Sequence, residues 1–226
     1  MFGGEKKMKT IIDVNELWIN GSSEDWRAAL NHYYNQPSVK RHIDLENKMN
    51  HLDPETIKKL DPVAFYEFLY NEYYVWKYTA NNRLVTTRKQ LEKHKDDITA
   101  LGRIQANIFK AFEIDPENTE LLFCSTQQIH GLGTAGASGL LSILFPKYYG
   151  TVDQFLVFAL QKIGSLPEHE KLQRIKDPEN LKVQDGVLLE NVLRNMAEKL
   201  NDKFGASHWT PRKVDMVLWA SNRKSE

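Results

Sequence analysis

Two closely spaced glycines, Gly131 and Gly133, stand near the middle of the 226-residue chain in a pattern that suits anion binding. The segment 129–137 reads apolar-x-Gly-apolar-Gly-x-x-x-Ala. Glycines let the backbone turn tightly, and without side chains they allow a phosphate to approach the amide groups. A helix starting at Thr134 would direct its positive N-terminal end to the same place. We therefore predict a phosphate-binding hairpin formed by His130, Gly131, Gly133 and Thr134.

The same glycines also have a purely structural interpretation. A glycine-rich turn can join two packed helices without binding a ligand, and the small residues that follow this turn would let the helices approach closely. His130 could equally be a polar residue that only faces solvent. From the hairpin alone, both interpretations stay open.

A single carboxylate, Asp153, follows Gly131 at a distance of 22 residues. Between them the sequence indicates an apolar helix, a break at Pro146 and a loop. A carboxylate beside a sugar can stabilise the positive charge that develops when a glycosidic bond breaks, and it can orient the attacking water. The alternative is that Asp153 only caps the helix that begins here, because aspartate is a favoured N-cap.

In the hairpin and this aspartate the sequence resembles the helix-hairpin-helix superfamily of base-excision DNA glycosylases, which includes endonuclease III and the 8-oxoguanine glycosylases. The similarity is strong over residues 129–160 and looser over 65–88 and 209–219. It implies that Asp153 is the catalytic residue of a hydrolase that removes a modified or damaged base from double-stranded DNA, as in base-excision repair. The hairpin would hold the DNA backbone without reading its sequence.

The resemblance also implies a fold and a domain organisation. We expect one all-α domain over residues 1–226, with the two-lobed helical fold of the DNA glycosylases. The hairpin motif would cover about 118–145. The lobes would be formed by about 85–165 and by the two terminal segments.

One position departs from the family. Its bifunctional members carry a Schiff-base lysine four residues after the first hairpin glycine, and this sequence has Ala135 there. Lys147, at the far end of the same predicted helix, is a poor substitute. The resemblance therefore implies a monofunctional glycosylase without lyase chemistry, or a member that has lost activity. His130 stands where the family usually has proline.

A target base that leaves the DNA stack needs an aromatic surface and hydrogen-bonding groups. The segment 73–83 has this composition, and we expect most of its aromatics in the core and one or two, with Tyr78 as a candidate, in a cleft. Arg83 and Arg88 are candidate phosphate contacts, with a solvated helix face as the alternative. Gln154, next to Asp153, could reach the cleft. Of two late tryptophans, 219 is expected in the core and 209 is left open.

Apolar residues at helical spacing and helix-start signals predict an all-α chain, and no alternating run is long enough for a central sheet. Pairs of a capping residue and a proline mark five helix starts, at Asp53, Asp61, Asp115, Asp177 and Thr210. Helices are predicted over residues 24–34, 61–79, 97–112, 117–128, 134–145, 152–163, 187–204 and 211–221. The segment 18–21 is predicted to be a short strand or a turn.

The charge of the chain gives no general support to nucleic-acid binding, because it has 30 basic and 30 acidic residues. The distribution is uneven, however. The segment 83–95 contains five basic residues and one acidic residue. Asp153 is the only acidic residue between 121 and 160. A neutral chain of this kind can still present a face that binds phosphates.

The composition also limits the classes of site and of cellular location. One cysteine, Cys124, excludes an internal disulfide framework and a four-cysteine iron–sulfur cluster. We expect no metal or other cofactor, although a monovalent or divalent cation could bind at the hairpin carbonyls. The lysine-rich segment 1–9 lacks a following apolar stretch, and no apolar run is long enough to cross a bilayer. We expect an intracellular, cytoplasmic protein, nucleoid-associated if bacterial, with neither a membrane nor an obligate protein partner.

Three functions remain for comparison. The first is a monofunctional DNA glycosylase that acts through Asp153. The second is a non-catalytic DNA-binding protein that uses the hairpin alone. The third is a soluble helical protein whose hairpin is only structural.

Overall fold

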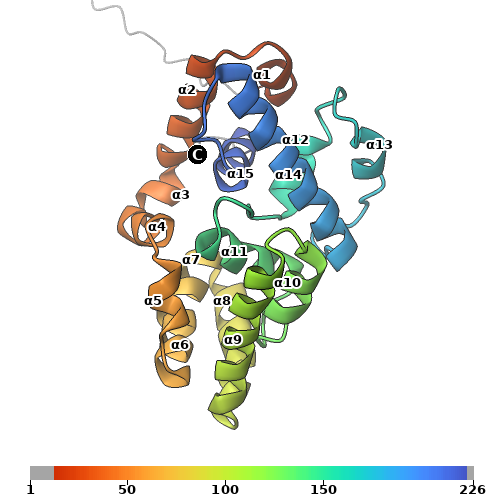
Figure 1. The fold of residues 1–226 in the computed structure, drawn as a ribbon. Coiled ribbons are helices and arrows are strands. Elements are labelled where there is room, and N and C mark those ends of the chain that lie inside the picture. The colour runs from red at the N-terminus through yellow and green to blue at the C-terminus, as the bar shows by residue number, and fades with distance from the viewer. Residues whose placement is uncertain (1–12, 223–226) are drawn as a thin grey trace, which may run out of the picture.

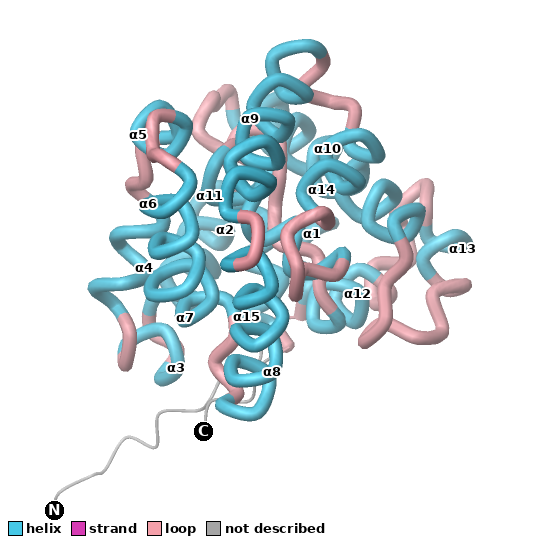
Figure 2. Tube along the Cα trace, turned by 90° about the horizontal axis from the view of Figure 1, so that it is seen from below, coloured by secondary structure: helices cyan, strands magenta, loops and turns pink. Residues whose placement is uncertain are grey.

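The computed structural model describes residues 13–222, and over this range it contains helices joined by turns and loops, without strands (Figure 2). The predicted all-α class is confirmed. The N-terminal segment 1–9 lies outside the described residues. Within them, no helix combines the length and apolar character needed to cross a membrane.

The elements follow one another with short connections in most of the chain. In order they are α1 (Val14–Asn20), α2 (Ser23–Tyr34), α3 (Pro37–Lys40), α4 (Ile43–Asn50), α5 (Pro54–Lys58), α6 (Pro62–Phe68), the π-helix η1 (Leu69–Tyr73), α7 (Tyr74–Lys77), α8 (Asn81–Leu91), the 3-10 helix η2 (Glu92–Lys95), α9 (Ile98–Ile114), α10 (Thr119–Thr126), α11 (Thr134–Leu144), α12 (Gln154–Leu160), α13 (His169–Leu172), α14 (Val183–Phe204) and α15 (Pro211–Ser221).

Local capping chemistry explains where many of these helices begin. Ser22 accepts a hydrogen bond from a first-turn amide of α2, and Asp53, Asp61 and Thr210 do the same for α5, α6 and α15. Each of these side chains satisfies an amide that has no partner within its helix. The helix starts predicted at Asp53, Asp61 and Thr210 are therefore confirmed.

Two of the predicted helix starts are wrong. The amide of Asp115 bonds back to Ala111, so this residue ends α9, and its carboxylate accepts from the amide of Glu117 in a turn. Asp177 accepts instead from the side chain of Asn180 in a loop. An Asp-Pro pair forms a turn as readily as a helix start, because the aspartate can bond to a nearby donor in either case.

The strand or turn predicted over residues 18–21 is also wrong, because residues 18–20 are the last turn of α1. Asp13 caps this helix, and Gly21 closes it with a bond to the carbonyl of Leu17. The indole of Trp26 donates to the same carbonyl at 3.1 Å. Tertiary packing on α2 thus stabilises a short helix whose sequence carries little periodicity of its own.

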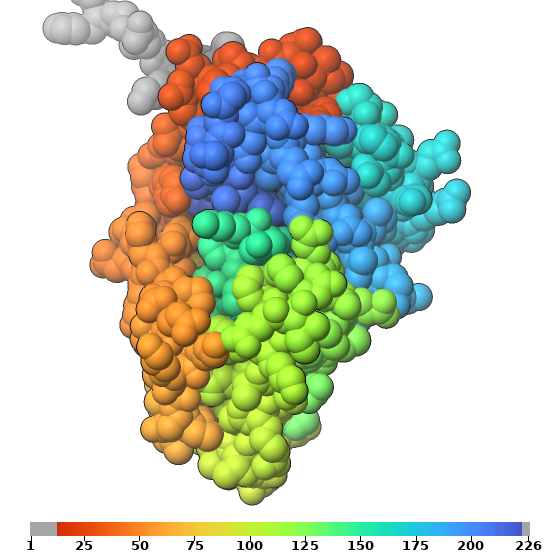
Figure 3. All heavy atoms as spheres, viewed as in Figure 1, coloured from red at the N-terminus to blue at the C-terminus, as the bar shows by residue number. Residues whose placement is uncertain are grey.

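The helices form two groups that meet around α7 and α11. Figure 1 shows α5, α6, α8, α9 and α10 at one end and α1, α2, α12, α14 and α15 at the other, with α7 and α11 between them. α15 packs on α2, α12 and α14, and α14 reaches across to α10 and α11. The N-terminal helices, red in Figure 3, therefore lie beside the C-terminal helices in blue.

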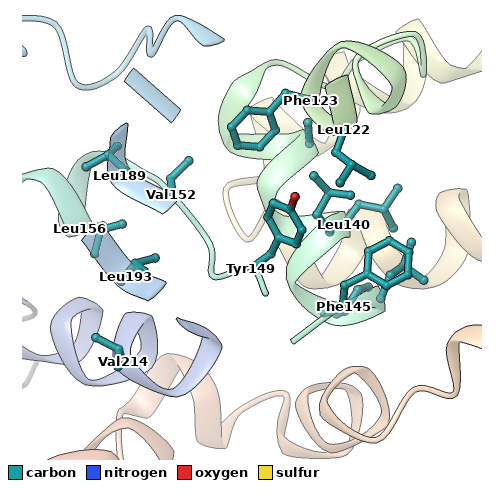
Figure 4. Packing of buried hydrophobic residues seen from close by; sticks show 14 of the residues in the cluster. Leu122, Phe123, Leu140, Phe145, Tyr149, Val152, Leu156, Leu189, Leu193 and Val214 are labelled. Carbon is teal, nitrogen blue, oxygen red and sulfur yellow. The ribbon is translucent and has the colours of Figure 1, made fainter. Parts of the chain in front are cut away.

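One continuous apolar core joins the two groups. In Figure 4, Tyr149 lies at its centre, between side chains of α10 and α11 on one side and side chains of α12 and α14 on the other. Its hydroxyl donates to the carbonyl of Pro116 at 2.8 Å. The labelled residues are Leu122, Phe123, Leu140, Phe145, Tyr149, Val152, Leu156, Leu189, Leu193 and Val214.

A buried ionic cluster ties the N-terminal helices to α15. Arg212 binds Asp215 at 2.7 Å and Glu46 at 3.1 Å, and all three side chains are less than 10% exposed. Glu46 also accepts hydrogen bonds from the hydroxyl of Tyr33 and the indole of Trp76. A single carboxylate on α4 therefore joins α2, α7 and α15.

Replacing Glu46 with alanine should lower the free energy of unfolding by about 3–5 kcal/mol, because it leaves Arg212 with one carboxylate and removes the acceptor of Tyr33 and Trp76. Urea denaturation followed by circular dichroism measures the loss. Lys58→Ala is the control, since its partner Glu113 and Lys58 itself are both exposed and such pairs contribute at most about 1 kcal/mol. Equal losses in the two variants would contradict a stabilising role for the cluster.

Candidate functional site

The hairpin between α10 and α11 has the backbone geometry that its glycines suggest. Gly131 has a φ of +94°, a conformation that L side chains rarely adopt. A Cβ there would also lie 2.8 Å from the carbonyl oxygen of Thr87 on α8. Gly133 precedes α11 in extended conformation, and no atom lies within 4 Å of where its Cβ would be. The first glycine is needed for the fold, whereas the second leaves open space.

The first turn of α11 offers unpartnered amides to this open space. Its N-cap, Gly133, makes no side-chain hydrogen bond. Among the described residues, none accepts from the backbone amides of Gly133, Thr134, Ala135 or Gly136 outside the helix. The side chain of Thr134 is buried, and its hydroxyl accepts from Gln127 at 3.0 Å. The backbone amide of Thr134 therefore has no partner among the described residues, while its side chain serves packing.

Three tyrosines hold the hairpin from the inside. Tyr74 and Tyr78 donate to the carbonyl oxygens of His130 and Gly131, at 2.8 and 3.3 Å. Tyr73, fully buried, donates to the carbonyl oxygen of Gly136. Burial raises the pKa of Tyr78 to about 12, so its hydroxyl keeps its proton at neutral pH. The hairpin is thus fixed on η1 and α7; a cation at its carbonyls stays a prediction.

His130 is exposed, and its backbone is bound on both sides. Its amide donates to Nε2 of His94 at 2.9 Å, and the two imidazole rings lie 4.4 Å apart. The histidine is therefore placed next to Gly131 with its ring at the surface, against a second histidine from η2. A phosphate contact by this ring remains a prediction.

Asp153 both caps a helix and borders a cleft. One oxygen, Oδ1, accepts from the amides of Phe155 and Leu156 at 2.9 and 3.1 Å. Within residues 13–222, Oδ2 has no hydrogen-bond partner. The side chain is half-buried and lines a cleft with a volume of about 440 Å³. The capping role of Asp153 therefore does not exclude a catalytic role, because Oδ1 caps the helix and Oδ2 stays without a partner among the described residues.

The cleft of Asp153 adjoins a second hollow beside the hairpin. That hollow, with a volume of about 560 Å³, is bordered by Gly131, Gly133 and Thr134. Four residues border both spaces: Tyr78, Arg83, Ala135 and Glu179. The space beside the hairpin and the cleft of Asp153 thus lie next to each other in the fold.

Most of the predicted contact residues come together here, but His130 and Arg88 border neither space. Tyr78, Arg83 and Gln154 line the cleft with Asp153. Arg88 lines neither space, because its guanidinium donates to the carbonyl oxygen of Tyr70 at 2.9 and 2.6 Å and lies over that ring. The basic residue five positions after Arg83 is therefore directed to another element.

The aromatic residues divide between core and cleft. Tyr73 and Tyr74 are buried, whereas Trp76 and Tyr78 line the cleft, as predicted for one or two members of this segment. The expectation that Trp219 lies in the core is wrong: it is half-buried and borders the cleft. Trp209 takes the core position instead, edge-on to Trp26.

The loop that carries Asp153 is held by three buried side chains that sequence reasoning missed. Glu190 accepts from the amide of Gly150, Asp215 from that of Thr151, and the hydroxyl of Ser138 from that of Val152, each at 2.9 Å. These acceptors come from α14, α15 and α11. An acidic residue within an otherwise apolar stretch, as at Glu190 and Asp215, was the signal that could have revealed them.

Burial dominates the electrostatics of these two carboxyl groups. It raises the pKa of Glu190 well above its ordinary value, against the opposing effect of the bond from Gly150. Burial also raises the pKa of Asp215 to about 6, although Arg212 acts in the opposite direction. Both groups accept hydrogen bonds from the backbone of the loop that carries Asp153, and Asp215 also borders the cleft.

The charges at the mouth of the cleft have mixed sign. Arg83 and Glu179 are both about 62% exposed, with their charged groups 3.9 Å apart, so their attraction is weak. In the described part of the chain, no three His, Cys, Asp or Glu side chains are grouped to hold a metal ion.

Comparison of the chain with models of known protein families, with curated proteins and with solved structures returned no match. The resemblance to the helix-hairpin-helix glycosylases therefore rests on the residues of the hairpin and on Asp153.

Glu190→Gln should change how stability depends on pH. With a raised pKa, folded Glu190 keeps its proton after the unfolded chain has lost it at about pH 4.3, so the wild type loses stability as pH rises. Relative to the variant, the loss should approach about 1.4 kcal/mol per pH unit until the folded group ionises. Denaturation at pH 4 to 8 measures it, with Glu198→Gln on the exposed face of α14 as control. Parallel pH profiles of wild type and Glu190→Gln would contradict the raised pKa.

Proposed function

We propose that this protein is a DNA N-glycosylase that binds double-stranded DNA through the hairpin and removes a modified or damaged base with Asp153. One observation supports this most strongly. The unpartnered oxygen of Asp153 borders a cleft that adjoins the open amides of Gly133 and Thr134. A nucleotide held by its phosphate at the hairpin could place its sugar beside this carboxylate.

The proposed chemistry needs one ionised carboxylate and a water molecule. As the bond between base and sugar breaks, its electron pair leaves with the base and positive charge develops at C1′ and the ring oxygen. Oδ2 of Asp153 would stabilise that charge and accept a proton from the water that adds to C1′. Because Ala135 stands where bifunctional relatives carry lysine, the hairpin helix itself supplies no amine.

The cleft has features suited to a base that has left the stack. Its volume of about 440 Å³ lies within the range of small-molecule sites. Trp76, Tyr78 and Trp219 border it and offer aromatic surfaces, and Gln154 offers an amide that can both donate and accept hydrogen bonds. Oxidised, alkylated and otherwise modified bases all remain candidate substrates.

The position of Asp153 is fixed before any substrate arrives. The bonds from Gly150, Thr151 and Val152 to three different helices leave the loop little freedom. An electrostatic group contributes most when it need not reorganise during the reaction. This rigidity supports a catalytic role more than a capping role, since a cap alone does not require a fixed loop.

Asp153→Asn should abolish most base excision while keeping the fold. Asparagine is as good an N-cap as aspartate, so the bonds to Phe155 and Leu156 can persist, but the negative charge is lost. We expect the excision rate to fall by about 100-fold or more. Duplexes with a panel of oxidised, alkylated and other modified bases, scored for abasic sites, provide the measurement. Excision at the wild-type rate by this variant would remove Asp153 from the mechanism.

Gly133→Ala should weaken duplex binding without disturbing the hairpin. The extended backbone at Gly133 accepts alanine, and its methyl group would enter the open space that a phosphate needs. We expect a roughly tenfold higher dissociation constant, equivalent to losing one hydrogen bond to a charged group. Gly164→Ala is the matched control, because its Cβ also meets no atom within 4 Å. Equal affinities for both variants would place the DNA elsewhere.

A salt titration separates the three candidate functions. Specific or non-specific duplex binding should weaken as salt increases, and Arg83→Ala should reduce the slope by about 1, whereas Arg88→Ala should not. Binding without excision on any duplex would favour a non-catalytic DNA-binding protein. No binding at low salt would leave the hairpin with a structural role only.

A further inference from the structure

A lysine enters the cleft of Asp153 from a helix outside the hairpin. Lys77, the last residue of α7, lines the same cleft as Asp153 and Ala135. Its side chain passes α11 at Gly139, where an added Cβ would lie 2.9 Å from Cδ and 3.2 Å from Cε of the lysine. Gly139 thus provides the space through which the stem of Lys77 reaches the cleft.

Lys77 differs from the other buried cation of this region, Arg212. Arg212 is held by two carboxylates, Glu46 and Asp215. For Lys77, the described residues provide neither a hydrogen bond nor an ion pair, although the side chain is half-buried. A charged lysine in such a place costs free energy that the carboxylates of Asp153 and Asp215 offset only in part. A structural role would not need an amine here.

The surroundings of Lys77 favour the neutral amine. Burial lowers its pKa, and the carboxylates of Asp153 and Asp215 oppose this effect without cancelling it. A lysine acts as a nucleophile only when it is unprotonated, and removal from water is a common way to reach that state in proteins. The cleft therefore holds a carboxylate together with an amine that loses its proton more readily than a lysine in water.

We propose that Lys77 is a second catalytic residue, which forms an imine with the sugar aldehyde left after base removal and so lets the protein cleave the DNA strand. This activity rests on the proposed glycosylase function, because excision supplies the aldehyde. α11 has Ala135 in place of a lysine and supplies no amine there. α7 supplies one through Lys77, whose stem passes α11 at Gly139.

The reaction balances without an external oxidant or reductant. Nζ of Lys77 adds to the C1′ aldehyde of the opened sugar, and the carbinolamine loses water to give a protonated imine. A base, for which Asp153 is placed in the same cleft, removes a proton from C2′. The electron pair forms the C1′=C2′ enamine, which expels the 3′ phosphate as the C3′–O bond breaks. Water then hydrolyses the resulting imine, which releases Lys77 and an unsaturated aldehyde.

The test traps the imine on DNA that already contains an aldehydic abasic site. The full chain is incubated with this duplex and sodium cyanoborohydride, which reduces an imine to a stable amine, and the crosslinked peptide is identified by mass spectrometry. A duplex with a tetrahydrofuran site, which has no aldehyde, shows the background. We expect the crosslink on Lys77, and strand cleavage of the abasic duplex without reductant.

Two variants make the assignment specific. Lys77→Met keeps the length of the stem, and it should fold at least as stably as the wild type, because it replaces a half-buried amine that has no hydrogen-bond partner among the described residues with an apolar group. It should reduce both the crosslink and strand cleavage to background. Lys147→Met, at an exposed lysine outside the cleft, should change neither.

The outcomes distinguish this inference from the function on which it rests. Crosslinks only at the N-terminal amine or at surface lysines, or an unchanged yield in Lys77→Met, would overturn the role of Lys77. Base excision that leaves intact abasic sites, with no crosslink at Lys77, would do the same while the glycosylase proposal stands. A crosslink at Lys77 without excision of any base would support the amine and contradict the glycosylase proposal.

Discussion

The buried guanidinium of Arg212 is the group on which the arrangement of this molecule depends. A cation of this kind must be surrounded by partners, because a buried charge that lacks them is strongly destabilising. Its partners come from different parts of the chain: Glu46 from α4 and Asp215 from α15. Glu46 also holds Trp76 of α7, and Asp215 also holds the amide of Thr151. The charge therefore fixes the N-terminal helices, α7 and the loop before Asp153 relative to one another.

The cleft is a consequence of this arrangement. Trp76 forms one wall, and the loop that ends at Asp153 forms another, so both are positioned by carboxylates bound to the same arginine. The hairpin is joined to the same unit, since Tyr74 and Tyr78 anchor its carbonyl groups. The amides of the hairpin and the carboxylate of Asp153 thus belong to one packed structure, in which neither can move far without the other. Such rigidity favours chemistry that depends on fixed electrostatics.

The sequence predicted the features that depend on neighbouring residues. The glycine pair predicted the tight turn of the hairpin, and Asp61 and Thr210 predicted helix starts, because turns and caps depend on a few neighbouring residues. The features it missed depend on contacts between distant segments. Arg88 turns to Tyr70, and Trp219, which is expected in the core, borders the cleft, while Trp209 is buried. Whether an aromatic or charged residue faces a core or a cleft is decided by what packs against it, and local periodicity does not contain that information.

The amine in the cleft also depends on a contact between segments that are distant in the sequence. The prediction of a monofunctional enzyme depends only on the hairpin helix, which has Ala135 in place of a lysine. Imine formation requires an unprotonated amine within reach of C1′ and places no condition on the helix that supplies it. In this fold α7 passes close to α11 at Gly139, which brings Lys77 into the cleft beside Asp153. An amine can therefore reach the cleft from a helix that lies outside the hairpin motif. In this chain α7 brings Lys77 there, although the motif itself has Ala135.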